Sequence, residues 1–444
     1  MERMKILSAR FNQVINSDRY KKLISVFLFL TLLFCACLSF YHTVINAVNL
    51  PFDDEFDIFV NPEMTKEFNF KWLLVPQGEA KIVLTRLLSW IFYHINGYNC
   101  ISLIIFNFFL SCIGYFVLYK ILKNIADDFV WLPLFFIPFF SDTFWMNRLI
   151  SFQSQVYFML LFSYVAIYYG LIKNKTLLSS VFCFLASISQ TFVSAIPIFF
   201  TCILKEIKEN KSKAIKALIL PTIIISLAIA FGLYGFYGPI DKNWEGYIYP
   251  NNLFFYRQAA YLTIKGIFLA RIETKLEIFV VFLSVVSLIT AVWQKRFYKE
   301  KAFYPLLAVY GMFFSFIIAD TFARGGYGLG ILPWHFDFFA YIIPTIAVTL
   351  YLLKLKNVLT IYTLLIVIFH TPHFTQGYQT FKEFGNNNKM NAECVYDAIN
   401  GLNNNICKGV YYSKDLTQVL NSAKRLNVSF VQTAKKHKKQ TIEK

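Results

Sequence analysis

The apolar run from Leu23 to Val48 constrains the fold of this chain more than any other feature. A helix needs about 20 apolar residues to cross a bilayer, and this run is longer than that. Residues 1–22 are rich in Lys and Arg, with Glu2 and Asp18 as their only acidic side chains. No small-residue cleavage site follows the run, so we expect an anchor rather than a cleaved signal peptide. The sequence therefore predicts that residues 1–22 lie in the cytoplasm.

The rest of the chain is also too apolar for a water-soluble domain. Hydrophobic residues make up 57% of its 444 residues and charged residues 16%, and the mean hydropathy is +0.50. We therefore predict an all-α polytopic membrane protein with about 11 transmembrane helices in residues 23–370. The predicted segments are 23–47, 98–121, 130–141, 156–172, 176–190, 191–204, 216–238, 276–293, 303–320, 336–353 and 357–370.

Basic residues indicate which loops face the cytoplasm. The apolar stretch from Thr176 to Leu204 is too long for one ordinary crossing, and Lys residues flank both of its ends. Two short helices that turn near Ser189, Gln190 and Thr191 fit it better, with both outer ends in the cytoplasm. Most other Lys and Arg also lie in short loops at helix ends, which accounts for the formal net charge of +17. Nucleic-acid binding therefore has little support.

Four external regions carry nearly all of the polar chemistry. They are residues 49–97, 141–155, 239–275 and 319–338. In the predicted orientation all four lie on one face, so a site built from several of them would lie at the outer membrane boundary. Ionisable residues at membrane depth are costly and usually mark a pathway or a site.

The first external loop, residues 49–97, contains four carboxylates in the run PFDDEFD: Asp53, Asp54, Glu55 and Asp57. Like-charge repulsion and partial desolvation raise the pKa of one member of such a cluster, which suits a general base near neutral pH. Asp53 or Asp54 could take a proton from a sugar hydroxyl, while the other two shape their field or hold a cation. A solvated acidic loop, or a cation site that only ties the loop down, are the alternatives. A divalent cation is the one cofactor that the run admits, and no His or Cys cluster suggests zinc.

Cationic and amide side chains on the same face complete the candidate site. Arg matches phosphate oxygens through its planar fork, and amides suit sugar hydroxyls. The residues proposed to bind donor or acceptor are Glu55, Asp57, Glu79, Lys81, Arg86, Arg148, Gln153, Gln155, Arg257, Arg324 and His335. The alternatives are that each Arg anchors a helix end, that the two Gln cap a helix, and that His335 is an interfacial residue. The glycines after Arg324 either let a phosphate approach the backbone or form a re-entrant turn.

The order of these motifs resembles that of bacterial GT-C-type membrane glycosyltransferases, which use a polyprenyl-phosphate sugar. Among them it is most similar to the phage-encoded serotype-converting glucosyltransferases that decorate O-antigen. Those proteins have an acidic pair soon after the first span, here Asp53 and Asp54. In many related proteins a His-x-Glu-x-Arg run follows. This chain has Glu79 at the Glu position, with Gln77 and Lys81 in place of the His and the Arg.

Two later motifs extend the resemblance over roughly residues 20–370. A Phe-Gln-x-Gln element is matched by Phe152 to Gln155, and the first half of a late Arg-x-Gly-x-Gly element is matched by Arg324 to Gly330. The Arg-Tyr pair that usually follows is replaced by Pro333 to Phe336, where His335 could stand in for the missing Arg. This departure bears on the donor-phosphate ligands more than on the base.

The resemblance implies a GT-C-like bundle in the bacterial inner membrane that transfers a hexose, most simply glucose. The donor would be undecaprenyl-phosphate sugar, and the acceptor a hydroxyl of lipid-linked O-antigen on the periplasmic side of the lipid bilayer. Asp54 or Asp53 would act as base in an inverting displacement. Arg or Lys would stabilise the departing phosphate, so no strong general acid is needed. Proteins that make and flip the donor are the implied companions.

The C-terminal tail, residues 371–444, is polar and net basic, which indicates a small periplasmic domain. Cys394 and Cys407 lie outside the predicted spans and their edges, and in an oxidising periplasm they are expected to pair. The six other cysteines are expected to be small residues of the membrane core. The tail could hold the acceptor glycan, or it could be a poorly ordered terminus, especially beyond Ser429.

Two other classes of protein remain open from the sequence. An O-antigen polymerase or ligase would be equally rich in Phe and Tyr, but its largest external loop is expected late in the chain, with Arg as the main polar residue. A lipid-linked sugar flippase would carry charges within its spans, around a central cavity, and internal repeats are expected in it. This chain has a long acidic first loop and no convincing repeat.

Overall fold

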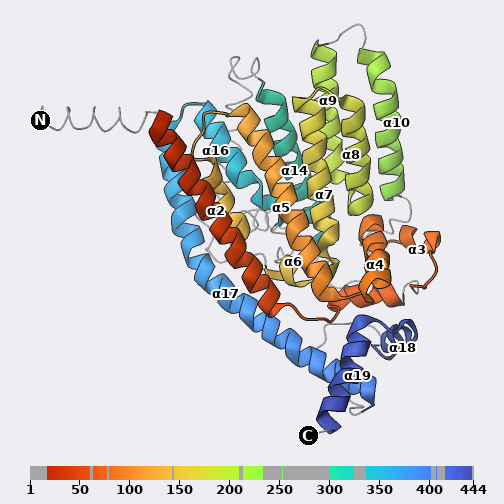
Figure 1. Cartoon of the computed structure of the whole chain (residues 1–444). Helices are drawn as coiled ribbons and strands as arrows, with labels where there is room; N and C mark the ends of the chain where they lie inside the picture. Colours follow the sequence, from red (N-terminus) through yellow and green to blue (C-terminus); the bar gives the residue numbers. More distant parts are fainter. Residues whose placement is uncertain are drawn as a thin grey trace, which may run out of the picture.

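The structure is a computed structural model, which describes residues 18–444 except 61–63, 78–79, 143–144, 210–213, 234–252, 254–300, 325–336, 402–406, 408–415 and 443–444. Helices dominate the described residues, and none of these residues lies in a β-strand. Gln77 and Ala80 form an isolated β-bridge. The all-helical class predicted from the sequence is confirmed for this part of the chain. Figure 1 shows most helices in one bundle, with a smaller group at its lower end.

Four described helices are long and apolar enough to cross a membrane. They are α2 (Asp18–Asn46), α5 (Cys100–Ile125), the continuous helical stretch Ser151–Ile172 and α10 (Ala214–Leu233). The third of these consists of η4 (Ser151–Gln153), α7 (Ser154–Ile167) and a π-helical turn, η5 (Tyr168–Ile172). Shorter apolar helices are α8 (Thr176–Ser189), α16 (Ile342–Leu352) and the first parts of α14 (Phe303–Arg324) and α17 (Lys356–Asn400). The expected span 276–293 lies outside the described residues.

The predicted span 130–141 is replaced by a buried 3-10 helix. This helix, η2 (Leu132–Phe140), has nine residues, with Pro133 in its first turn and Pro138 inside it. A 3-10 helix rises about 2 Å per residue, so η2 is about 18 Å long and too short to cross the hydrocarbon layer. Its Phe136 is buried, so this apolar run belongs to the core of the bundle.

The hairpin expected between residues 176 and 204 is present. α8 ends at Ser189, and after the short 3-10 turn η6 (Phe192–Ser194) the chain continues as α9 (Ala195–Glu209). The Thr191 hydroxyl accepts the N–H of Val193 at 3.3 Å, so a polar residue in the middle of the apolar run caps the new helical segment. α10 and α7 both pack against α8.

Two hydrophobic cores hold the described residues together. The larger core lies in the bundle and is formed by side chains of α5, η2, α7, α8, α9, α14 and α16. The second core lies in the helices at the lower end of Figure 1 and includes Phe56, Trp72, Val395 and Phe430. We call these helices the outer cap: η1 (Asp53–Phe59), α3 (Phe70–Leu74), α4 (Val83–Asn96), the end of α17, α18 (Leu416–Leu426) and α19 (Ser429–Ile442).

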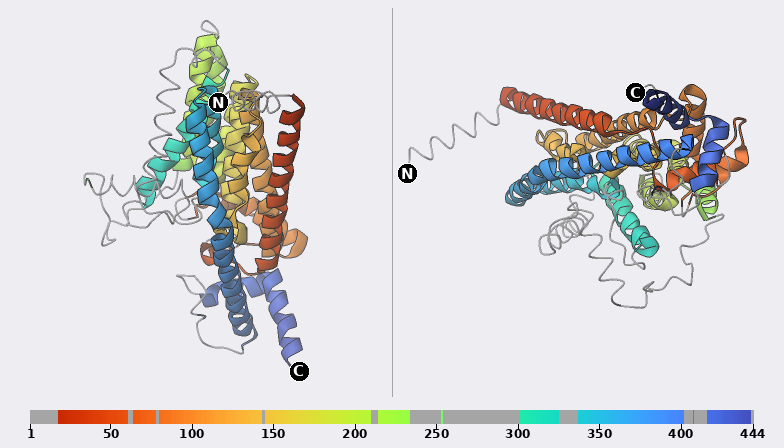
Figure 2. Two further views of the ribbon diagram at one scale, coloured as in Figure 1. Left: turned by 90° about the vertical axis from the view of Figure 1, so that its left-hand side faces the viewer. Right: turned by 90° about the horizontal axis from the view of Figure 1, so that it is seen from below.

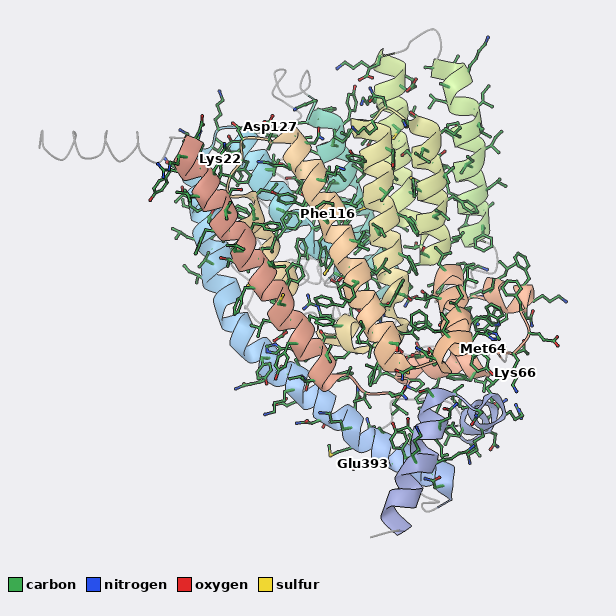
Figure 3. All side chains as sticks on the ribbon, in the orientation of Figure 1. Lys22, Met64, Lys66, Phe116, Asp127 and Glu393 are labelled. Carbon is green, nitrogen blue, oxygen red and sulfur yellow. A yellow bond between two sulfur atoms is a disulfide. The ribbon has the colours of Figure 1, made fainter. Side chains whose placement is uncertain are left out.

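The first loop and the C-terminal tail lie at the same end of the molecule. Figure 3 places Met64, Lys66 and Glu393 at this end, and Lys22 and Asp127 at the opposite end. α17 contacts α2 along one flank of the bundle and continues into the outer cap (Figures 1 and 2). The first loop and the tail therefore lie at one end of the described residues, opposite the end that carries Lys22 and Asp127.

The tail is docked on the first loop by specific contacts. The predicted boundary at residue 370 falls inside α17, a 45-residue helix that runs without interruption from the bundle into the cap. The Ser429 N–H donates to the carbonyl of Gly97 at 2.6 Å, and the Asn49 amide donates to the Ser429 hydroxyl at 2.9 Å. Cys394 and Cys407 form a disulfide, with their Cα atoms 5.9 Å apart. Residues 430–442 belong to α19 and are not an irregular terminus.

Candidate functional site

The acidic run forms η1, a seven-residue 3-10 helix that gives its carboxylates different environments. The backbone N–H of Phe52 donates to Oε2 of Glu55 at 3.2 Å, which fixes the start of the helix. Glu55 and Asp57 point into the cap and are buried, whereas Asp53 is half-buried and Asp54 is exposed. Asp53 has a φ of +49°, a left-handed conformation that is uncommon for a residue with a Cβ. The two carboxylates expected to react are therefore the two that solvent reaches.

The pKa of Asp53 is raised to about 6. Burial is the main cause, and repulsion by the neighbouring carboxylates Asp54 and Asp57 adds to it. A carboxyl group with such a pKa is ionised at neutral pH but binds a proton more readily than an ordinary Asp. This is the property expected of a general base. The backbone carbonyl of Asp54 accepts the side-chain N–H of Gln77 at 2.7 Å, so the acidic pair is attached to the turn at residues 77–80.

Glu55 joins the first loop to the bundle. Its Oε1 accepts the hydroxyl of Tyr98 at 2.7 Å and the hydroxyl of Ser151, which begins the third long helical stretch. Burial raises the pKa of Glu55 to about 7, although the hydrogen bonds from Ser151, Tyr98 and Phe52 oppose this shift. With 1% of its surface exposed, Glu55 is sealed from solvent and links the first loop to the bundle.

Arg86 lies on the buried face of α4, close to the acidic run. Its Nη2 donates to Oε1 of Gln77 at 3.0 Å, and its guanidinium lies over the Trp72 ring, 5.2 Å from the centroid. Burial lowers the pKa of Arg86 to about 10, and the negative charge of Asp57 opposes this shift. Because Gln77 also contacts the backbone of Asp54, Arg86 supports the acidic pair from inside the cap.

Lys81 lies where the first loop meets the tip of the α8–α9 hairpin. Its backbone N–H donates to the carbonyl of Gln190 at 3.3 Å. Its ammonium group donates to the carbonyl of Leu74 at 3.4 Å and lies 5.3 Å from the centroid of the Phe231 ring. Burial lowers the pKa of Lys81. This cation is therefore internal, at the junction of the loop with the bundle.

The two glutamines of the FQSQ element lie at the start of the same helical stretch. The side chains of Gln153 and Gln155 are both partly exposed. Oε1 of Gln155 is buried and has no hydrogen-bond partner among the described residues. The neighbouring Ser154 hydroxyl donates to the hydroxyl of Thr85 in α4 at 2.9 Å, so this element also contacts the first loop.

Arg148 is buried inside the bundle and not at an open phosphate site. Its guanidinium donates to the Ser39 hydroxyl and to the carbonyl of Phe139, and it lies over two phenylalanine rings. Nearby, Nδ1 of His42 and Oδ2 of Asp142 are 2.7 Å apart. The His42 ring lies 4.5 Å from that of Tyr378 in α17.

Asp337 is a second buried carboxylate that contacts this region. It is 2% exposed and accepts hydrogen bonds from the hydroxyl of Tyr115 at 2.8 Å and the amide of Asn147 at 2.5 Å. The Tyr157 hydroxyl donates to it at 3.5 Å. We call His42, Asp142, Asn147, Arg148 and Asp337 the inner polar cluster. Sequence reasoning missed His42, Asp142 and Asp337 as candidates; the available signal was that each carboxylate stands alone at the edge of an apolar segment.

Several candidate residues lie outside the described part of the chain. Glu79, Arg257 and His335 are among them. Arg324 is the last residue of α14, but its side chain is not among those described. Within the described residues, no three or more His, Cys, Asp or Glu side chains form a group that could hold a metal ion.

The site therefore has two described parts. The acidic run, Gln77, Lys81 and Arg86 are linked through the first loop, and the inner polar cluster contains Arg148. Searches of protein-family models, curated proteins and solved structures found no match to this chain.

Proposed function

We propose that this protein is an inverting membrane glycosyltransferase with Asp53 as its general base. The donor is an undecaprenyl-phosphate hexose, most simply glucose, and the acceptor is a hydroxyl of lipid-linked O-antigen. The observation that carries the proposal is the environment of Asp53, a half-buried carboxyl group with a pKa of about 6 beside the exposed Asp54. This pair lies in the outer cap of an all-helical protein with several helices able to cross a membrane.

The proposed reaction is a direct displacement at the anomeric carbon. The Asp53 carboxylate removes the proton of the acceptor hydroxyl as its oxygen bonds to the anomeric carbon, and the bond to the phosphate oxygen breaks. Undecaprenyl phosphate leaves as an anion, so cationic groups are sufficient to stabilise it. Lys81 is the described cation attached to the same loop, and Arg257, Arg324 and His335 remain proposed ligands. A divalent cation at Asp53 and Asp54 is an alternative source of positive charge.

The proposed setting is the bacterial inner membrane, with about 11 spans, a cytoplasmic N-terminus and a periplasmic outer cap. The disulfide between Cys394 and Cys407 supports this orientation, because disulfides persist in oxidising compartments such as the periplasm. The contacts of the tail with the first loop support a role for the tail in holding the acceptor glycan.

A lipid-linked sugar flippase is the second candidate, and the inner polar cluster favours it. Asp142, Arg148 and Asp337 are buried charges among apolar helices, and such groups often line a transport pathway. Against this candidate, the hydrogen bonds of Asp337 and Arg148 are made to other side chains and backbone of the bundle, as in a structural network.

The test is a transfer assay with the purified full-length protein in liposomes. Radiolabelled undecaprenyl-phosphate glucose and lipid-linked O-antigen are supplied together, and label in the glycan is measured. Asp53→Asn is expected to lower the transfer rate by about 10²- to 10⁴-fold, because the variant side chain cannot accept the proton. The wild-type rate is expected to rise about tenfold per pH unit below pH 6 and to level off above it, since only ionised Asp53 is active.

The matched control is Glu67→Gln, which removes an exposed carboxylate from the same loop and is expected to leave the rate unchanged. A comparison with Asp54→Asn tells which member of the pair is the base. Full transfer by both Asp53→Asn and Asp54→Asn would overturn the catalytic assignment. Movement of the donor across the bilayer without transfer to the acceptor would instead establish the flippase.

A further inference from the structure

Most buried side chains of α4 are polar and most of its exposed side chains are apolar, unlike those of a helix that packs on a water-exposed protein surface. Its buried side chains are Thr85, Arg86, Leu88 and Ser89, whereas its exposed side chains are His94 and two isoleucines, Ile91 (38%) and Ile95 (72%). A helix at a protein–water boundary buries its apolar face and exposes its polar one. The arrangement in α4 therefore indicates that its exposed face meets an apolar medium.

Exposed apolar side chains of the preceding segment extend this face. Phe68 is 52% exposed and Phe70 is 64% exposed, and the Phe68 ring packs edge-on against Trp90 of α4. We call Phe68, Phe70, Ile91 and Ile95 the α3–α4 patch. Figure 1 shows α3 and α4 at the lower end of the bundle, below α8 and α10.

The α8–α9 hairpin gives the depth at which α4 begins. α8 has 14 residues and is therefore about 21 Å long, whereas the hydrocarbon layer is about 30 Å thick. Exposed Lys173 and Lys175 precede α8, which places its first turn at the opposite membrane surface. Its other end, at Gln190, therefore stops about 9 Å short of the outer boundary.

The contact between Lys81 and Gln190 places the start of α4 at this depth. The Lys81 N–H donates to the Gln190 carbonyl, and α4 begins two residues later at Val83. The other end of α4 contacts the start of α19, where the carbonyl of Gly97 accepts the N–H of Ser429. A helix about 10 Å in diameter fills the space that the short hairpin leaves. α4 therefore lies along the outer boundary of the membrane, with its first turn in the hydrocarbon.

The charges beside the patch fit lipid phosphates. Lys66 and Lys71 are exposed on either side of Phe68 and Phe70, and Glu67 is the one exposed acidic side chain described between them. The net charge of this edge is positive. Lys side chains next to apolar groups commonly reach from the hydrocarbon to the phosphate level.

We infer that the α3–α4 patch binds the outer leaflet of the membrane, with acyl chains against Phe70, Ile91 and Ile95 and lipid phosphates against Lys66 and Lys71. This interaction surface does not depend on the proposed reaction. It has a consequence for the acidic run, because Arg86 on the opposite face of α4 contacts Gln77, which in turn contacts Asp54. Lipid contact with α4 therefore fixes the height of η1 above the membrane.

Spin labels test the inference in the full-length protein, reconstituted in vesicles of phosphatidylethanolamine and phosphatidylglycerol. The background variant is Cys37→Ala, since Cys37 is the exposed free cysteine among the described residues. Labels are placed by Ile95→Cys and Phe70→Cys, and by Met390→Cys as the control. Met390 is 60% exposed on the cap part of α17, so its label is expected in water.

Collisions with oxygen, which concentrates in lipid, are compared with collisions with a water-soluble nickel chelate. At positions 95 and 70 the oxygen rate is expected to exceed the chelate rate several-fold, and at position 390 the order is reversed. A chelate rate at position 95 as high as at position 390 would overturn the inference, because the patch would then face water. Low collision rates for both reagents would also overturn it, because they indicate that protein covers the patch. Dipolar broadening between labels would do the same, because it indicates that a second copy of the chain covers the patch.

Discussion

The acidic run of η1 and the inner polar cluster contain carboxylates with opposite roles. In η1, Asp54 is exposed and Asp53 is half-buried, so solvent can reach them. In the inner polar cluster, Asp142 and Asp337 are 3% and 2% exposed and are held by polar side chains from distant parts of the chain. An accessible carboxylate with a raised pKa can exchange protons with a ligand, whereas a sealed one fixes the helices around it.

The same comparison separates two residues within η1 itself. Asp53 and Glu55 both have raised pKa values, and in both cases burial is the main cause. Glu55, however, accepts hydrogen bonds from Tyr98 and Ser151 and is sealed in the cap core. A perturbed pKa therefore identifies a candidate base only together with access to the group.

The largest effect is expected from Asp337→Ala. The Tyr115 hydroxyl and the Asn147 amide then lose the Asp337 carboxylate as a hydrogen-bond acceptor inside the bundle. This loss costs about 3 to 5 kcal/mol of stability. Unfolding in mixed detergent micelles measures the change, with the exposed Asp127→Ala as control. If both variants are as stable as the wild type, the inner polar cluster is not structural, and a role in a pathway gains support.

A smaller loss of stability is expected when the disulfide is removed by replacing Cys394 and Cys407 with Ser. The bridge closes a loop with a sequence separation of 13, which corresponds to about 3 kcal/mol in the chain-entropy description. The loss should be confined to the outer cap, so amide exchange is expected to increase in α18 and α19 but not in α5. Equal acceleration in α5 would contradict the division into two cores.

A pH-dependent effect of about 3 kcal/mol is expected from Glu55. Its folded-state pKa of about 7 lies above the usual value, so the folded cap binds a proton that the unfolded chain has released. The contribution is fully present below pH 4.5 and is lost as the pH rises through 7. Glu55→Gln should remove this slope between pH 5 and pH 8 in a denaturation series. An unchanged slope would show that another group is responsible.

Much of the fold followed from apolar length and charge. The run Leu23–Val48 predicted α2, and the length of the stretch 176–204 with its basic flanks predicted the α8–α9 hairpin. The prediction of a membrane span at 130–141 was wrong, because Pro133 and Pro138 favour a short 3-10 helix. An apolar segment that is buried among other helices does not have to be long enough to cross the membrane. The continuity of α17 across residue 370 was also missed, since its cap half is polar. That half is stabilised by packing against α19 and by contacts of Tyr396 with Asn49 and of Phe384 with Phe52.

The sequence by itself determined that this is a helical membrane protein with an acidic run beside its first span, because apolar length and local charge are properties of contiguous residues. Only the tertiary structure decided which carboxylates are open and which are sealed. Asp53 and Glu55 are two residues apart, yet one meets solvent and the other meets Tyr98 and Ser151. Likewise, His42, Asp142 and Asp337 come together only because the helices that carry them pack side by side, and burial depends on that packing rather than on neighbours in the chain.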